Sequence, residues 1–109
     1  MRELLMDGSG WRGQDDLYDA FFRAVGAPAW HGRNFNALRD SIGIGRINKI
    51  DVPYRIVIRN FDLIGEDALK MVVDFANLIR ELAADGCPAD IELRSSSGEL
   101  VKVNSGGSN

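Results

Sequence analysis

Residues for covalent or metal-centred chemistry are scarce in this sequence. It contains one cysteine, Cys87, and one histidine, His31. Disulfide frameworks need several cysteines, and zinc sites combine cysteine and histidine ligands at set spacings. The sequence therefore excludes a disulfide framework and a cysteine-rich metal site, and we predict neither a metal nor a cofactor.

Long apolar runs and a strong excess of charge of one sign are also missing. No stretch approaches the roughly 20 apolar residues that span a membrane, and MRELLMDGSG (1–10) lacks the apolar core of a secretory signal. The formal net charge is -3 and the pI is about 5.0, so the chain as a whole does not attract the phosphates of a nucleic acid. We expect a cytoplasmic protein that binds neither membrane nor nucleic acid.

What is present is the composition of one ordinary globular domain. The chain has 109 residues, of which 45% are hydrophobic and 27% are charged, enough to bury about two-thirds of the surface of the unfolded chain. β-Branched runs between turn residues predict strands, and apolar residues three and four apart predict helices. The predicted strands are 2–7, 54–60 and 89–94, and the predicted helices are 14–25, 34–42 and 65–85.

The order of these elements predicts the fold class. Strands that alternate with helices indicate a parallel sheet with right-handed crossovers. We therefore predict an α/β domain over residues 1–95, with a three-stranded parallel sheet covered by helices. The remaining residues, 96–109, are predicted to hold an additional strand and a disordered tail: SSSGELVKV (95–103) is the candidate for a hairpin strand, and the Ser- and Gly-rich end is predicted to be disordered.

The segment between the first two helices has the composition of a binding loop. Gly26 and Pro28 end the first helix, and Asn34 is a suitable N-cap for the second. Gly32 allows a partner's backbone to approach closely, and tryptophan is enriched among residues that anchor protein interfaces. A tryptophan in a loop more often packs on the core. If Trp30 is instead an interface anchor, it should be partly exposed in the free protein.

Two helices combine an apolar stripe with a polar one. In the second helix the apolar residues are Phe35, Leu38 and Ile42. The polar residues on its opposite side are Asn36, Arg39 and Asp40. On the long helix a polar stripe repeats at spacings of four, three and four residues: Lys70, Asp74, Asn77 and Glu81. Polar stripes are usually solvated surface, so neither stripe alone identifies a site.

Together these features resemble the barstar family, the intracellular inhibitors of secreted ribonucleases such as barnase. The resemblance is carried by a Pro-x-aromatic-x-Gly-x-Asn-x-x-Ala-Leu-x-Asp pattern, here Pro28, Trp30, Gly32, Asn34, Ala37, Leu38 and Asp40. A second match, IRELAADG (79–86), places Glu81 on a family contact position, and Phe61 also falls into register. The resemblance covers about residues 2–95.

The resemblance implies a protein that blocks an active site. In the family, the second helix and the loop before it enter the ribonuclease active site, which is basic because it binds the phosphates of RNA. Asp40 matches the carboxylate that takes the place of a phosphate and accepts charge-assisted hydrogen bonds. Glu81 matches an acidic contact, and Trp30 matches an aromatic that packs on the rim. The implied partner-binding residues are Trp30, His31, Gly32, Arg33, Asn34, Asn36, Arg39, Asp40, Gly43, Asn77 and Glu81.

Three positions depart from the family pattern. Asn36 stands where the family has a second aspartate, Arg39 where it has a tryptophan, and Arg33 where it has an acid. Cations opposite a basic active site are unfavourable unless the partner supplies acids there. We therefore expect a monomer that forms a 1:1 complex with another extracellular ribonuclease, or with the nuclease domain of a toxin, in place of barnase.

Catalysis is one competing class of function. It would rely on His31 with Asp40, or on Cys87. A histidine nine residues before an aspartate is weak geometry for a catalytic pair, and no second base or nucleophile motif accompanies them. We predict that the protein is not an enzyme.

An RNA-binding module is the alternative. Trp30 would stack on a base, while Arg33, Arg39 and Arg46 would contact phosphates. Asp40 within that patch and the net negative charge argue against this function. Salt-dependent binding to labelled RNA would distinguish the two, since an inhibitor should show none.

Overall fold

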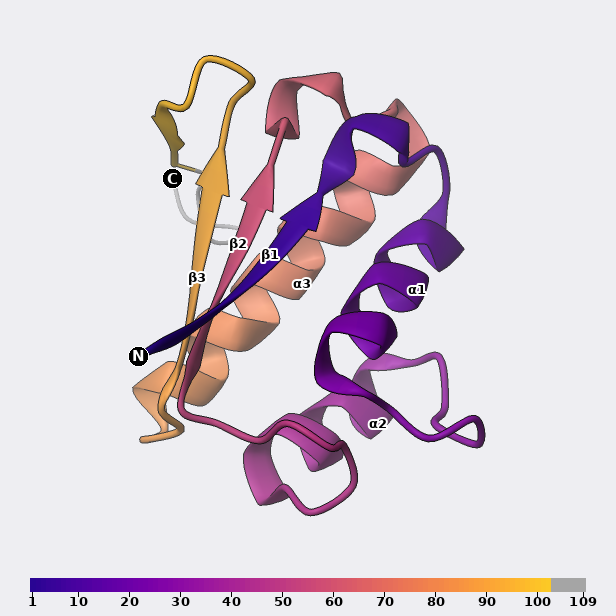
Figure 1. Ribbon diagram of the computed structural model, residues 1–109, viewed down its shortest axis with the longest axis vertical. Helices are drawn as coiled ribbons and strands as arrows, with labels where there is room; N and C mark the ends of the chain where they lie inside the picture. Colours follow the sequence, from indigo (N-terminus) through magenta and orange to yellow (C-terminus); the bar gives the residue numbers. More distant parts are fainter. Residues whose placement is uncertain (103–109) are drawn as a thin grey trace.

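A four-stranded sheet and three α-helices form the computed structural model, which describes residues 1–102 (Figure 1). The strands are β1 (Arg2–Asp7), β2 (Tyr54–Arg59), β3 (Ala89–Arg94) and β4 (Leu100–Val101), and the helices are α1 (Gln14–Val25), α2 (Phe35–Arg39) and α3 (Glu66–Ala84). Three short turns are also helical: η1 (Gly8–Gly10), η2 (Asp40–Ile44) and η3 (Phe61–Leu63). The predicted α/β fold class is confirmed. The end of the tail that we predict to be disordered falls on residues 103–109, outside the described residues.

The three long strands are parallel and follow one another in the order β1-β2-β3. Both crossovers therefore step in the same direction across the sheet, and right-handed crossovers of this kind place their helices on the same face. Figure 1 shows α3 crossing behind the strands, and α1 packs against both β1 and α3. β4 pairs antiparallel with β3, as predicted for the hairpin strand.

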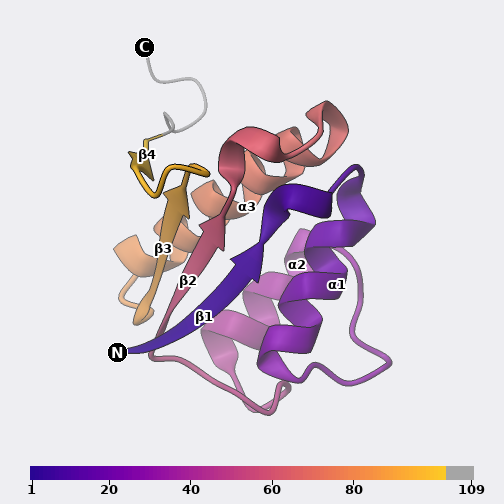
Figure 2. The ribbon, with the colours of Figure 1, turned by 45° about the horizontal axis from the view of Figure 1, so that its top comes forward.

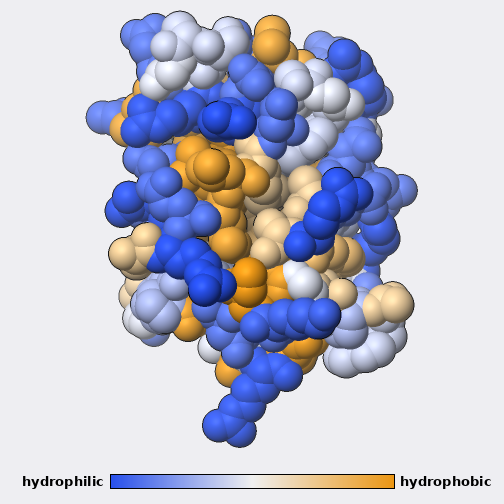
Figure 3. Space-filling model, in the orientation of Figure 1, coloured by the Kyte–Doolittle hydropathy of each residue, from blue (hydrophilic) through white to orange (hydrophobic). Residues whose placement is uncertain are grey.

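The opposite face of the sheet has no helix over it in Figure 2 and is the face seen in Figure 3. Our prediction of a covered sheet therefore holds for one face. On the open face, Arg55 pairs with Asp90 at 3.0 Å and with Glu3 at 3.8 Å. The registers of β1, β2 and β3 place these three residues opposite one another, so a row of alternating charge occupies part of the surface that a second helical layer would cover.

The core lies between the sheet and the helices. Its strand residues alternate, so that Leu4 and Met6 of β1 point toward α1 and α3 while their neighbours stay exposed. Phe21 of α1 and Phe75 of α3 meet edge to face, with ring centroids 5.3 Å apart. The core also includes Trp11, which is 6% exposed. Trp11 lies in a turn-rich segment where no periodic pattern predicts burial.

Asp7 joins the ends of two strands. Its Oδ1 accepts hydrogen bonds from the Ser9 backbone N–H at 2.9 Å and from Asn60 Nδ2 at 2.8 Å. These bonds, the one from Asn60 foremost, lower the pKa of Asp7 from 3.8 to about 2. A carboxyl whose pKa is lower in the folded state stabilises the fold above its unfolded pKa, and that contribution is lost as the pH falls through its folded pKa.

We therefore expect Asp7 to contribute to acid unfolding. The free energy of unfolding should fall between pH 3.8 and about 2 as Asp7 takes up a proton. In Asp7→Asn, which cannot titrate, this decline should be shallower. Urea unfolding at a series of pH values measures the slope, and an identical slope in the variant and the parent protein would contradict the role given to Asp7.

Candidate functional site

The loop between α1 and α2 presents Trp30 to solvent. α1 ends at Gly26, whose φ of 66° lies in the left-handed region that glycine adopts most readily. In the turn that follows, the backbone N–H of His31 donates to the carbonyl of Pro28 at 3.0 Å. Trp30 lies within this turn and is 74% exposed. The exposure expected of an anchor is therefore present.

His31, the next residue, points into the protein and is 7% exposed. Its Nδ1 donates to the carbonyl of Gly32 at 2.8 Å, and its Nε2 lies 2.8 Å from the Ser41 hydroxyl. The ring also packs on Phe22 of α1, with centroids 4.4 Å apart. Both ring nitrogens have partners, as a buried polar group requires. Within the predicted partner-binding set, His31 thus lies behind the surface that its neighbours form.

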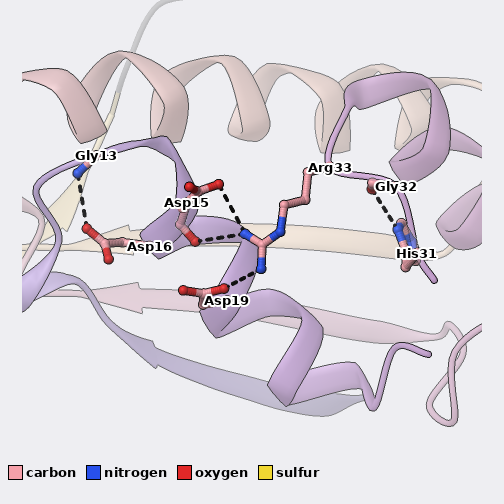
Figure 4. A network of polar contacts seen from close by, with 7 residues as sticks. All are labelled: Gly13, Asp15, Asp16, Asp19, His31, Gly32 and Arg33. Atoms are coloured by element: carbon pink, nitrogen blue, oxygen red, sulfur yellow. Dashed lines mark hydrogen bonds and ion pairs between the residues drawn. The ribbon is translucent and has the colours of Figure 1, made fainter. Parts of the chain in front are cut away.

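Arg33 turns away from α2 and lies over α1 (Figure 4). Its guanidinium forms ion pairs with Asp15, at 3.2 Å, and with Asp19. It also lies 5.9 Å from the centroid of the Tyr18 ring and 5.6 Å from that of Phe22. Exposed ion pairs contribute little stability each, but these contacts direct the positive charge toward two carboxylates of α1.

α2 begins as predicted at Asn34, whose Oδ1 accepts the Ala37 backbone N–H at 2.8 Å. Gly32 leaves room for this cap, because a Cβ there would lie 2.9 Å from Asn34 Nδ2 and would push the capping side chain aside. Leu38 is buried and faces the core. The apolar stripe thus anchors α2 and turns its polar side outward.

Asp40 begins the π-helical turn η2, which continues the second helix to Ile44. The predicted helix ended at Ile42, and the extra length comes from an i→i+5 bond, in which the Gly45 N–H donates to the Asp40 carbonyl at 3.3 Å. The Asp40 side chain is exposed. Within residues 1–102 its carboxylate has no hydrogen bond or ion pair, so it is free to accept bonds from a partner.

Two hollows adjoin this helix. The first, which we call the Trp30–Asp40 slot, has a volume of about 130 Å³ and is lined by Trp30, His31, Gly32, Ala37, Asp40 and Ile47. It brings the predicted aromatic anchor and the predicted phosphate mimic to the same hollow. Asn36 and Gly43 are exposed nearby but line neither hollow.

The second hollow, the α2–α3 groove, has a volume of about 510 Å³ and is lined by Phe35, Arg39, Asp74, Asn77, Leu78, Arg80, Glu81 and Ala84. Arg39 Nη2 and Glu81 Oε1 form an ion pair at 2.7 Å between its two helices. Asn77 Oδ1 and Arg80 Nη1 are buried and have no hydrogen-bond partner within residues 1–102. The groove therefore joins three predicted contact residues, and it already neutralises the charge of Glu81.

Several residues of this face are not in the predicted set. Asp15 and Asp19 are four apart on α1 and so share one side of that helix. Their spacing marks them as an acidic pair, but nothing local shows that Arg33 reaches them. Ile47 and Arg80 carry no sequence signal of this kind.

The single thiol of the chain is not activated. Cys87 is half-buried, and burial raises the pKa of its thiol, which keeps it protonated and weakly nucleophilic. Among the described residues, no three histidine, cysteine, aspartate or glutamate side chains gather as they would around a metal ion. No helix in that part of the chain is both long and apolar enough to cross a bilayer.

Comparison with protein families assigns most of the chain to one family. The family model described as Barstar (barnase inhibitor) matches residues 1–95, which includes the loop, α2 and the end of α3. No curated protein matches the chain. The family match spans the three parallel strands and every residue of the predicted partner-binding set. The chain therefore belongs to the barstar family of ribonuclease inhibitors.

Proposed function

We propose that this protein inhibits a secreted ribonuclease, or the nuclease domain of a toxin, by placing Asp40 in its active site. The observation that carries the proposal is the Trp30–Asp40 slot, where an exposed carboxylate without an internal partner lies beside an exposed tryptophan. Such a carboxylate can take the position of an RNA phosphate and accept charge-assisted hydrogen bonds from the enzyme's cations. Trp30 supplies the apolar contact area that anchors interfaces.

The charges around the slot favour a basic partner. Over the slot, the α2–α3 groove and the ion pairs of Arg33 taken together, the carboxylates are Asp15, Asp19, Asp40, Asp74 and Glu81, and the guanidinium groups are Arg33, Arg39 and Arg80. Because Arg33 pairs with the α1 aspartates, its charge is compensated before a partner arrives. A complementary potential of this kind steers association and favours the correct orientation.

The partner we propose is extracellular, whereas the inhibitor stays in the cytoplasm as a monomer and forms a 1:1 complex. Passing culture medium from the source organism over the immobilised protein tests this. The protein retained should be a nuclease, and its activity on fluorescent RNA should fall to zero at one equivalent of inhibitor. Columns carrying Asp40→Ala should retain much less of it. A retained protein without nuclease activity, or one that both columns hold equally, would contradict the proposal.

RNA binding is less well supported by the site. Of the three arginines that would supply the cations, Arg33 and Arg39 are engaged by carboxylates, and Arg46 is exposed without an ion pair within residues 1–102. A phosphate approaching Arg33 or Arg39 would meet Asp15, Asp19 or Glu81 as well. Labelled RNA should therefore show no salt-dependent binding to this protein, and such binding would favour the RNA-binding module instead.

Trp30→Ala is expected to weaken nuclease binding by about 2 kcal/mol or more, because a central aromatic anchor is lost. The free energy of unfolding should change by less than about 0.5 kcal/mol, since the ring is exposed in the free protein. Inhibition titrations and urea melts measure the two effects. Tryptophan fluorescence should change on complex formation and lose most of that change in the variant.

A matched control is Leu63→Ala, which removes another exposed apolar side chain, 49% exposed, from η3. It should leave inhibition unchanged. Unfolding of Trp30→Ala would instead assign the tryptophan to the core.

A further inference from the structure

Trp30 remains exposed although it neighbours a deeply buried residue. It is 74% exposed, whereas His31 is 7% exposed. The turn from Pro28 to His31 is closed by a backbone hydrogen bond of 3.0 Å, so the position of Trp30 depends on where the turn ends. That end is His31.

His31 connects the turn to two helical elements. Through Nε2 it contacts Ser41 of η2 at 2.8 Å, and through its ring it packs on Phe22 of α1. Because the Gly32 carbonyl can only accept, Nδ1 carries a hydrogen, and in the neutral ring Nε2 accepts the Ser41 hydroxyl. Ser41 is 1% exposed, so the contact lies inside the protein and is shielded from competing water.

Arg33, two residues after His31, is attached to the same part of α1. Its guanidinium lies over the ring of Phe22, and the ring of His31 packs against the same phenylalanine. The ion pairs of Arg33 with Asp15 and Asp19 complete this attachment. Two residues on the C-terminal side of Trp30 are therefore attached to α1, and on its N-terminal side the loop begins at the end of α1, Gly26.

We propose that His31 is a positioning residue, which holds Trp30 in its binding-competent place through Ser41 and Phe22. This inference rests on the proposed function, in which Trp30 meets the nuclease. Ordering a loop during association weakens binding, so a loop ordered beforehand binds more tightly. His31 would thus act on affinity through the turn that it closes.

The test is ¹⁵N relaxation of the free full-length protein. In Ser41→Ala and His31→Ala, the backbone order parameters of Trp30 and Gly32 should fall from about 0.85 to below about 0.6. His31→Gln, whose amide reaches the position of Nε2, should restore part of the order. Ile79→Val is the control, because it removes buried volume from α3 and lowers stability without touching the loop. If His31→Ala does not fold, Ser41→Ala still breaks the contact.

Inhibition by the same variants completes the test. With the nuclease recovered from culture medium, Ser41→Ala should inhibit roughly threefold to tenfold less tightly. Unchanged order parameters in the folded variants would overturn the positioning role, and so would a loosened loop with unchanged inhibition. Failure of the parent protein to inhibit any nuclease would overturn the proposed function alone, since the relaxation measurement needs no partner.

Discussion

Replacing Asp40 by alanine or asparagine is expected to weaken nuclease inhibition by about 2–5 kcal/mol, the general range for truncating one member of a buried charge pair, of which barnase–barstar in this same family is a standard example. Most of that loss comes from cations of the enzyme that are left buried without a partner. Asp40→Asn should therefore lose nearly as much as Asp40→Ala, because charge matters more here than shape.

The same substitutions should have little effect on folding. The Asp40 side chain is exposed and makes no hydrogen bond or ion pair within residues 1–102. It also lies beyond the first turn of its helix, where the dipole of the N-terminus has little effect. The free energy of unfolding should stay within about 0.5 kcal/mol of the parent value.

Inhibition kinetics and urea melts of each variant measure both effects. The Asp40 variants should act mainly on the dissociation rate of the complex. Asp85→Asn is the control, since Asp85 is an exposed carboxylate at the end of α3 and should change the association rate and its dependence on salt. Full inhibition by Asp40→Asn would contradict the proposal that Asp40 takes the place of a phosphate.

Barnase itself should be inhibited weakly or not at all. Asn36 lacks the carboxylate that the family pattern has at this position. Arg39 replaces the family's tryptophan and holds Glu81 in an ion pair of 2.7 Å, so a second acidic contact is neutralised within the inhibitor. A basic active site therefore meets a cation and only part of the acidic surface that complements it.

The double variant Asn36→Asp, Arg39→Trp is expected to bind barnase more tightly by about 2 kcal/mol or more, roughly thirtyfold. It adds a carboxylate, restores the aromatic and releases Glu81 from its ion pair. Titration calorimetry or inhibition of barnase measures the change. Nanomolar inhibition of barnase by the parent protein would show that these departures do not select the partner.

Arg33→Glu provides a structural control for this experiment. Although Arg33 also replaces an acid of the family pattern, its guanidinium points to Asp15 and Asp19 on α1. A glutamate there would face two like charges, so it should lower stability and give no gain toward barnase. A gain equal to that of the double variant would mean that the loop leaves α1 in the complex.

The sequence alone determined the strands, caps and helix ends that depend only on neighbouring residues. The β-branched run at 54–60, the cap at Asn34 and the end of α1 at Gly26 each depend on neighbouring residues, and all three are found in the structure. The exposure of Asp40 was also predictable, because it follows from the three-and-four spacing of the apolar stripe, which is a property of a short segment. The composition of the loop left Trp30 either packed on the core or exposed as an anchor, and the structure shows it exposed.

Tertiary structure alone decided which charges meet. Arg33 is 14 residues from Asp19 and Arg39 is 42 residues from Glu81, and both pairs form because the chain brings α2 and its preceding loop against α1 and α3. The inward direction of His31 and the burial of Trp11 have the same origin. A single side chain without a periodic neighbour has no local preference strong enough to show where it points, and its position follows from the packing of elements that are distant in sequence.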